Sequence, residues 1–280
     1  MLAASGASPE SPHGPGAVRR RCFVAQIEYA ARQLDVDLTW YSDHWVAHLR
    51  YAGRQQHLVG YAFPLNDLSA AHLADDKVAT SVVLARDGVP HIHHELLWVA
   101  AEAEFEVGAL AVLDRVPVPL VVKPCTGRGG LDVFRATSVS GYLTVVRALA
   151  RAHRTLAVCP LVAIEREFRV IYLRGGAELI FEKVRPDGHR DWRHNLEHGA
   201  VPVVVDDSAT CAALAALAKQ AATALGISFA SIDIVQSDRG LEVLELNSGV
   251  SLEYFSRSNA EHFQLAAEVY RRALQACLDC

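Results

Sequence analysis

The feature that most constrains the fold is a strand pair near the carboxyl end, residues 231–249, with the sequence SIDIVQSDRGLEVLELNSG. Apolar residues alternate on both sides of the turn-forming SDRG, which predicts a half-buried antiparallel hairpin. Three side chains that carry oxygen interrupt this pattern: Asp233, Glu245 and Asn247. A buried core would favour none of them, so the hairpin needs a second explanation besides folding.

The polar side chains of the hairpin predict a site for a hard divalent cation. Side chains at i and i+2 share a strand face, so Glu245 and Asn247 project together while Leu244 and Leu246 face the other way. A three-residue loop, or a bulge, would bring Asp233 opposite Glu245. Mg²⁺ takes one or two carboxylates, keeps waters and binds substrate phosphates. On this hairpin alone, a solvated sheet face with incidental acids is the alternative.

A glycine-rich segment, VVKPCTGRGG at 121–130, predicts a phosphate contact. Lys123 ends an apolar strand, and Gly127, Gly129 and Gly130 let backbone N–H groups approach an anion closely. Such a turn is more often only a turn. It is not a P-loop, because G-x-x-x-x-G-K-[ST] does not occur in the sequence.

Two further segments carry arginines that suit phosphate or carboxylate oxygens. Arg169 ends the strand motif EFR, and Arg193 lies in the polar loop DWRHNLEHGA. Their planar, permanently charged guanidinium groups fit such anions, and Asn195 offers both a donor and an acceptor. Taken singly, each would be interpreted as a surface residue.

Composition excludes several classes of protein. The chain has 280 residues, 51% of them hydrophobic, which supports a substantial core in one large domain or two to three small ones. Its formal charge of −5, with acids and bases interleaved, argues against a nucleic-acid partner. No apolar run reaches the roughly 18 residues of a membrane span, so we expect no membrane partner. The partner is expected to be a small molecule.

The ends of the chain and its cysteines indicate a reduced, cytoplasmic protein. The Pro-rich start has no apolar h-region and does not resemble a secretory signal; residues 1–18 are expected to be a disordered tail. Six cysteines are scattered, and Cys277-x-x-Cys280 lacks a second pair of that kind. In the segment HIHHE, which also contains His94, His91 and His93 share a strand face, but no third metal ligand is indicated. Cys125 is interpreted as a small loop residue.

Periodicity predicts an α+β fold with largely antiparallel sheets. Helices are expected over 19–34, within 66–87, and over 104–115, 140–152, 208–225 and 260–278. Strands are expected at 36–41, 56–63, 92–98, 119–124, 131–136, 155–162, 166–173, 177–184 and in the hairpin. We expect a short leading domain at 19–75, a central subdomain at 76–160 and a carboxyl-terminal subdomain at 161–280.

In their order, these motifs resemble the ATP-grasp superfamily of carboxylate–amine ligases over roughly 66–255. The helix ADDKVATSVVLARDGVP resembles the family's opening helix, with Lys77 at its first nucleotide-contacting lysine. The segments FEKVRPDGHRDWRHNLEHGA and ASIDIVQSDRGLEVLELNSG are most similar to the ribosomal-protein glutamate ligases and lysine-biosynthesis ligases. The resemblance implies ATP held between two α+β domains, after a short, truncated α/β domain.

The resemblance also implies roles for residues of this sequence. Lys77 and Lys123 would contact the nucleotide phosphates, with the loop 125–130 folding over them. Further cofactor-binding residues would be Cys159, Pro160, Leu161 and Val162 beside adenine, Leu244 as its floor, Glu167 near the ribose, and Lys183. Relatives usually carry Glu or Gln where this chain has Cys159-Pro160, which leaves backbone groups at Leu161 and Val162 to read the adenine edge.

The chemistry implied is amide formation through an acyl phosphate, with release of ADP and phosphate. Asp233, Glu245 and Asn247 would hold two Mg²⁺ ions, with Mn²⁺ as a substitute. Arg193 is expected at the transferring phosphoryl group, with Arg169 on the γ-phosphate side and Asn195 beside them. Residues facing the acceptor are expected to be Ser248, Gly249, Ser251 and Glu253.

We therefore predict an ATP-dependent ligase for amino-acid-like carboxylate and amine substrates, of a kind that suits specialised metabolism such as antibiotic biosynthesis. It would join two molecules or close a ring within one, as a homodimer or homotetramer. Three alternatives stay open: a ligase that modifies a protein terminus, a nucleotide-binding regulator without turnover, and a phosphotransferase.

Overall fold

The computed structural model describes residues 21–99, 102–127, 129–188 and 191–279. The expected tail, His189 and Cys280 lie outside these ranges. The helices are α1 (Cys22–Gln33), α2 (Leu68–Asp75), α3 (Lys77–Arg86), α4 (Glu102–Leu113), α5 (Val139–Leu149), the 3₁₀ turn η1 (Leu196–His198), α6 (Ser208–Leu225), α7 (Glu253–Ser256) and α8 (Ala260–Leu278). The strands are β1 (Asp37–Tyr41), β2 (Val46–Tyr51), β3 (Arg54–Val59), β4 (Glu95–Trp98), β5 (Leu120–Pro124), β6 (Phe134–Ala136), β7 (Thr155–Pro160), β8 (Arg166–Leu173), β9 (Gly176–Val184), β10 (Val201–Val204), β11 (Phe229–Ser237) and β12 (Gly240–Asn247).

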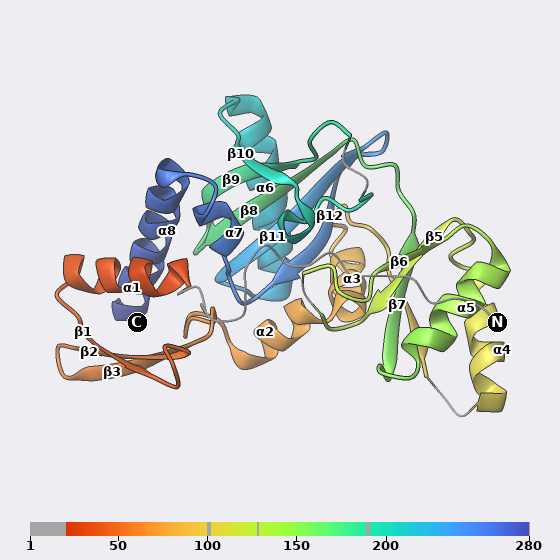
Figure 1. Cartoon of the computed structure of the whole chain (residues 1–280), viewed down its shortest axis with the longest axis horizontal. Helices are drawn as coiled ribbons and strands as arrows, with labels where there is room; N and C mark the ends of the chain where they lie inside the picture. Colours follow the sequence, from red (N-terminus) through yellow and green to blue (C-terminus); the bar gives the residue numbers. More distant parts are fainter. Residues whose placement is uncertain (1–20, 100–101, 128, 189–190, 280) are drawn as a thin grey trace, which may run out of the picture.

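The strands form three sheets, which Figure 1 shows side by side along the molecule. Their orders are β1-β2-β3, β10-β9-β8-β11-β12 and β4-β7-β5-β6. Neighbouring strands in each sheet run antiparallel. This confirms the predicted α+β class. The leading segment, expected as α/β, instead joins one helix to an antiparallel sheet.

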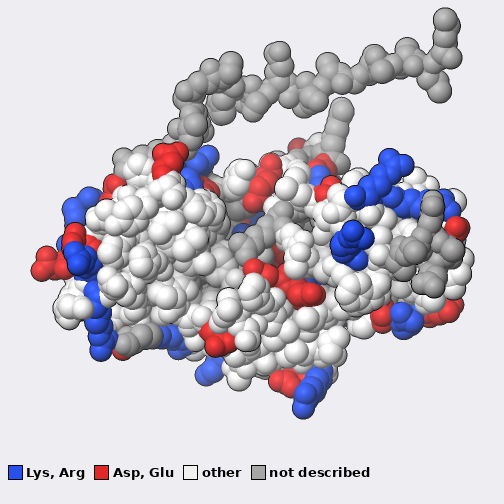
Figure 2. All heavy atoms as spheres, turned by 90° about the horizontal axis from the view of Figure 1, so that it is seen from below, with Lys and Arg blue, Asp and Glu red and all other residues white. Residues whose placement is uncertain are grey.

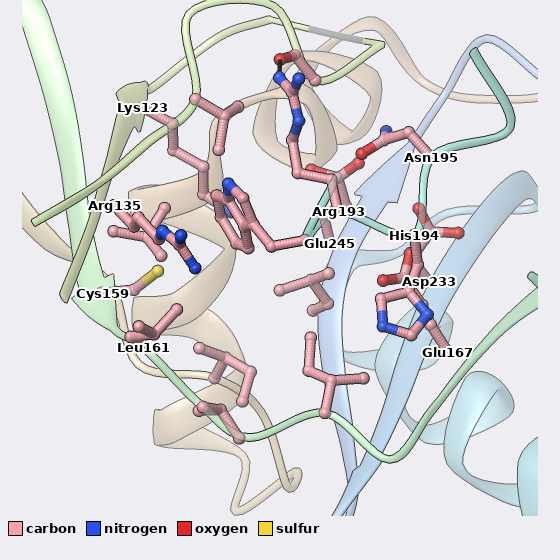
Figure 3. Close-up of a pocket in the computed structure, with 18 of the residues that line it drawn as sticks. Lys123, Arg135, Cys159, Leu161, Glu167, Arg193, His194, Asn195, Asp233 and Glu245 are labelled. Atoms are coloured by element: carbon pink, nitrogen blue, oxygen red, sulfur yellow. Dashed lines mark hydrogen bonds between the residues drawn. The ribbon is translucent and has the colours of Figure 1, made fainter. Parts of the chain in front are cut away.

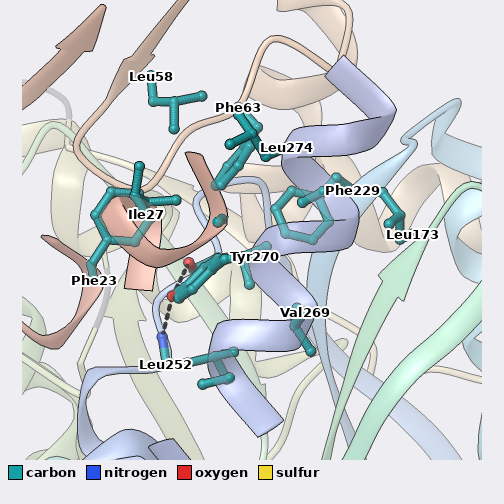
Figure 4. Close-up of a cluster of buried hydrophobic side chains, with 14 of the residues drawn as sticks. Phe23, Ile27, Leu58, Phe63, Leu173, Phe229, Leu252, Val269, Tyr270 and Leu274 are labelled. Atoms are coloured by element: carbon teal, nitrogen blue, oxygen red, sulfur yellow. Dashed lines mark hydrogen bonds between the residues drawn. The ribbon is translucent and has the colours of Figure 1, made fainter. Parts of the chain in front are cut away.

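The leading segment shares one core with the carboxyl-terminal helices (Figure 4). Phe23 of α1 lies edge-on to Tyr270 of α8, with ring centroids 4.9 Å apart. The Tyr270 hydroxyl accepts from the Leu252 N–H at 2.9 Å and donates to the Val250 carbonyl at 3.1 Å. Phe229 and Phe181 of the five-stranded sheet belong to the same cluster. These contacts fix α1 to the residues that follow β12.

Two further cores lie on the other side of the five-stranded sheet and under the four-stranded sheet. The first contains α6 with Leu84 of α3, packed on Ile232 and Ile234 of β11. The second contains α4 and α5 packed on the four-stranded sheet, with Tyr142 fully buried. Thus α3, which we placed in the segment 76–160, packs on the sheet of the segment after it. The expected domain limits stay a prediction.

Several elements differ from the expectation for local reasons. The strand expected at 56–63 ends at Val59, because Gly60 adopts φ +63° and a Cβ there would lie 2.7 Å from the Trp45 ring. The sequence pattern missed β2, α7 and the edge strand β10. Strand β10 contains Pro202, and its valines are partly exposed, which weakens the strand signal. Helices α6 and α8 match their predicted limits.

The described surface carries charge of both signs. Figure 2 shows acidic and basic side chains interspersed over one face, without a broad patch of one sign on the part described. Among the residues that the structure describes, no helix is long and apolar enough to cross a membrane.

Candidate active site

The hairpin β11–β12 brings its two carboxylates together, as its sequence predicted. Asp233 pairs with Glu245, whereas the next pair inward is Ile234 with Val243. Leu244 is therefore the extra residue of a β-bulge. Strict alternation placed Leu244 on the core face with Leu246; this is wrong, because the bulge turns Leu244 into a cavity beside Glu245 while Val243 takes the core position.

The cavity next to these carboxylates has a volume of about 430 Å³ (Figure 3). It lies between the four-stranded and the five-stranded sheets, and both supply lining residues. It collects most of the predicted site residues: Lys77, Lys123, Gly127, Gly129, Gly130, Cys159, Pro160, Leu161, Val162, Glu167, Arg193, Asn195, Asp233, Leu244 and Glu245. One end is charged and the other is apolar.

A buried ion cluster surrounds Asp233 at the charged end. Arg169 donates to both Asp233 oxygens at 2.7 and 2.8 Å, and Lys183 Nζ lies 2.8 Å from Oδ2. Lys183, with a side chain only 1% exposed, also donates to Glu167 at 2.7 Å. Burial alone would raise the pKa of Asp233, but the charges of Arg169 and Lys183 outweigh it and hold the pKa well below its usual range. Asp233 is an anion here.

Two lysines reach the cavity from α3 and β5. Lys77 Nζ donates to the Gly127 carbonyl at 2.8 Å and lies 3.8 Å from Glu245 Oε2. Burial, aided by the charge of Lys123, lowers the pKa of Lys77, although Glu245 opposes the shift. Lys123 is only 6% exposed, and no described residue accepts a hydrogen bond from its ammonium group. A nearly buried cation that lines a cavity is suited to an anionic ligand.

Arg193 joins the polar loop to the glycine-rich loop. Its guanidinium donates to both Asp191 oxygens at 3.0 and 2.7 Å, and its Nη1 donates to the Gly130 carbonyl at 2.7 Å. Gly130 has φ +68°, and a Cβ there would lie 3.0 Å from Asn195 Oδ1, so the close approach requires glycine. Hydrogen bonds from Arg193 hold the pKa of Asp191 well below its usual range.

The apolar end is a slot between side chains of both sheets. Ile92, Val121, Cys159 and Val235 form its buried part, and Leu161, Val162, Ile164, Trp192 and Leu244 pack against them. Of the backbone groups expected to read a base edge, the Leu161 N–H instead donates to the Pro119 carbonyl at 3.0 Å. The Leu161 carbonyl and the backbone groups of Val162 stay candidates for that purpose.

Residues of this site that sequence reasoning missed include Asp191, Trp192, Val121 and Arg135. Asp191 and Trp192 stand directly before Arg193, so the motif DWR carried a signal that we assigned to the arginine alone. Val121 belongs to the apolar strand that ends at Lys123. Arg135 had no signal, because only the register of β6 on β5 brings it to the cavity.

Seven predicted site residues do not line the cavity: Arg169, Lys183, Asn247, Ser248, Gly249, Ser251 and Glu253. Asn247 donates to Glu245 Oε1 at 3.3 Å, and Ser248 donates to Asp75 from both N and Oγ. Both oxygens of Glu253 accept from the first backbone N–H groups of α1, at 3.0 Å each. Their roles toward substrate stay predictions, and the geometry gives Glu253 a structural task.

The histidine cluster and Cys125 have local partners. His93 Nε2 lies 2.8 Å from Glu95 Oε1, and Arg115 Nε lies 2.8 Å from the other oxygen, Glu95 Oε2. The Nδ1 atoms of His91 and His94 each lie 2.8 Å from a backbone carbonyl oxygen. Cys125 is buried, and burial raises its pKa to about 11. A thiol of this kind is a poor nucleophile near neutral pH.

The oxygen donors of the hairpin fit Mg²⁺ in chemical type. Asp233 uses three of its roughly four lone-pair sites on Arg169 and Lys183, which leaves about one for a metal. Glu245 and the amide oxygen of Asn247 supply the other possible metal ligands on the same strand face. No group of three or more His, Cys, Asp or Glu side chains suited to a metal occurs among the described residues. The described residues therefore offer few protein ligands to a metal ion, as expected for Mg²⁺, which also binds waters and phosphates.

Known proteins share both the sequence pattern and the fold. The model of the RimK-like ATP-grasp domain matches residues 74–271. A probable alpha-L-glutamate ligase of Klebsiella pneumoniae (strain 342) is 30% identical over 200 residues, covering 71% of this chain and 64% of that protein. One from Legionella pneumophila (strain Corby) is 23% identical over 237 residues, covering 85% and 72%. The chain thus spans less than two thirds of the length of the Klebsiella relative.

A solved structure, D-alanine–D-alanine ligase from Bacillus anthracis, superimposes with a TM-score of 0.58 at 14% identity and covers 76% of this chain and 72% of that one. The matched domain and this fold define the class as the ATP-grasp proteins, as the order of motifs implied. Within that class, the chain belongs to the RimK-like ATP-grasp family.

Proposed function

We propose that the protein is an ATP-dependent carboxylate–amine ligase that releases ADP and phosphate. The observation that carries this proposal is one cavity lined by the cations Lys77, Lys123 and Arg193 together with the Asp233–Glu245 pair. Cations and carboxylates in this arrangement suit a nucleotide triphosphate with its metal. The family and its ligase relatives support the same conclusion.

The chemistry proceeds in two steps. A carboxylate is a poor acyl donor because its leaving group would be oxide, so the γ-phosphoryl group of ATP passes to a carboxylate oxygen and ADP leaves. The amine then attacks the acyl carbon, phosphate departs with the former carboxylate oxygen, and the amine loses a proton. The phosphoryl transfer requires charge stabilisation more than acid–base catalysis.

The side chains divide this work by position. Lys77 and Lys123 neutralise the nucleotide phosphates, and Arg193 stabilises the transferring phosphoryl group. Asn195 assists beside it. Magnesium, one or two ions held by Asp233, Glu245 and Asn247, would supply further charge neutralisation when bound. Arg169, whose guanidinium lies on Asp233 and not at the cavity wall, acts as a positioning residue for that carboxylate.

The substrates are proposed to be amino-acid-like small molecules, joined to each other or closed into a ring. Glutamate is the first amino acid to test, because the curated relatives are named as probable glutamate ligases. A cytoplasmic location and a dimer or tetramer stay predictions, which fractionation and light scattering would check.

The function is tested by incubating the protein with ATP, Mg²⁺ and an amino-acid library that includes glutamate. We expect equal amounts of ADP and phosphate, together with a product whose mass equals two substrates less water, or one substrate less water where a ring closes. ADP without free phosphate would indicate a phosphotransferase. Nucleotide binding without ADP would indicate a regulator, and an added mass on a lysate protein would indicate a post-translational ligase.

A further inference from the structure

Arg135 of β6 lies at the apolar end of the cavity, where no charge was expected. In the register of the four-stranded sheet, Arg135 pairs with Val121 of β5, and Val121 pairs with Cys159 of β7. The three residues form a row across the sheet. Figure 3 shows the Arg135 guanidinium beside Cys159 and Leu161, and Arg135 is one of the residues that line the cavity.

The side chain of Arg135 is exposed. Among the residues that the structure describes, none forms a hydrogen bond, ion pair or ring contact with it. By contrast, Arg169 and Arg193, which lie near the charged end of the cavity, are each bound to a carboxylate. The donors of Arg135 therefore remain available to a ligand in the slot.

The side chains that pack around the slot are apolar, apart from the Cys159 thiol and the Trp192 indole, which is a donor. The carboxylates that line the same cavity, Glu167, Asp233 and Glu245, belong to its charged end. Burial raises the pKa of Cys159, so it stays a neutral thiol. The slot thus offers a ligand the hydrogen-bond donors of the Arg135 guanidinium, whereas strong acceptors within the slot come from the backbone.

This balance of donors and acceptors distinguishes between purines. The exocyclic amine of adenine needs an acceptor, whereas the neighbouring O6 and N7 atoms of a 6-oxopurine are both acceptors. A guanidinium fork pairs with these two atoms in a bidentate contact, which adenine cannot reproduce. We infer that Arg135 reads the base and that the cavity takes 6-oxopurine triphosphates, GTP and ITP, besides ATP. The inference rests on the proposed function only in requiring a nucleotide in this cavity.

The test measures binding, so it needs no knowledge of the carboxylate or the amine. The wild-type protein and the variants Arg135→Met and Arg135→Lys are titrated with Mg²⁺ complexes of ATP, GTP, ITP and UTP in a calorimeter. We expect wild-type affinities for GTP and ITP within about 10-fold of that for ATP. We expect Arg135→Met to weaken the binding of GTP and ITP by about 10-fold or more, and to change the affinity for ATP little. Arg135→Lys, which keeps the charge but not the fork, should fall between.

The matched control is Arg147→Met on α5 of the same sheet unit, where Arg147 is exposed and pairs with Glu106. It removes the same charge and should leave all four affinities unchanged. If wild type binds GTP no better than UTP, or if Arg135→Met weakens ATP and GTP equally, the inference is wrong while the proposed function stands. If no triphosphate binds, both are wrong.

Discussion

At the scale of single residues, the site depends on charges that are buried and mutually satisfied. Asp233 holds Arg169 and Lys183, and Lys183 also holds Glu167. Such a cluster adds little net stability, since desolvation offsets the attraction, but removing one member leaves a buried charge without a partner. Its value is geometric, because it fixes the carboxylate that faces Glu245.

Arg193 provides the sharpest functional prediction. Replacing it by alanine removes the cation proposed for the transferring phosphoryl group, and we expect kcat for ligation to fall by roughly 10²–10³-fold. The affinity for ATP should change much less, because Lys77 and Lys123 still neutralise its phosphates. Turnover and calorimetric titration would be measured together. The control is Arg239→Ala, an exposed arginine paired with Glu242 in the hairpin turn. Near-normal turnover of Arg193→Ala would exclude the assignment.

Cys125 provides a prediction on pH. Its pKa is raised to about 11 by burial, so at pH 8 about one thiol in a thousand is ionised, and reactivity should rise only as the pH approaches the pKa. We expect a maleimide at pH 8 to leave Cys125 unmodified in the native protein and to modify it in urea. The partly exposed Cys211 should react earlier. Peptide mapping by mass spectrometry reports each site, and rapid native modification of Cys125 would contradict its burial.

At the scale of elements, the sequence predicted what depends on neighbours along the chain. Helices α6 and α8 and the hairpin followed from apolar periodicity and the SDRG turn, and the bulge was one of the two arrangements, beside a three-residue loop, that would pair the two carboxylates. What it missed depends on contacts between distant segments. The position of Arg193 rests on Gly130, and that of Arg135 on the register of β6, so neither could be read from local pattern.

Glu253 shows how a distant element completes a helix. No side chain caps α1 locally, and the carboxylate of Glu253 takes that place by accepting from Cys22 and Phe23. We expect Glu253→Ala to lower the free energy of unfolding by about 1–3 kcal/mol in urea denaturation without substrate. Glu106→Ala, which breaks an exposed ion pair, should cost less than about 1 kcal/mol. Unchanged stability with lost ligation would instead support the substrate role predicted for Glu253.

At the scale of the whole molecule, the cavity depends on two sheets that have separate cores. The glycine-rich loop belongs to the four-stranded sheet and the carboxylates belong to the five-stranded sheet, whereas the apolar slot takes side chains from both. A bound nucleotide would therefore contact both units at once, and its binding energy would oppose their separation.

This arrangement predicts how ligands change stability. ATP with Mg²⁺ at 100 times its Kd should add about 2.7 kcal/mol to the free energy of unfolding, seen as a rise in Tm. Chelation of Mg²⁺ by EDTA should reduce that rise, because the phosphates would then face Asp233 and Glu245 without a cation between them. A thermal scan with ATP, with and without EDTA, measures both effects. A rise in Tm that EDTA leaves unchanged would argue against the metal site.

The bulge at Leu244 also has an evolutionary consequence. Because the residues on either side of it keep their partners in β11, a gain or loss of one codon at this point changes the lining of the cavity and leaves every other side chain of the hairpin on its face. A single insertion or deletion at the bulge can therefore alter the ligand slot while the strand keeps its register. One codon more or less elsewhere in β12 would exchange its core and cavity faces.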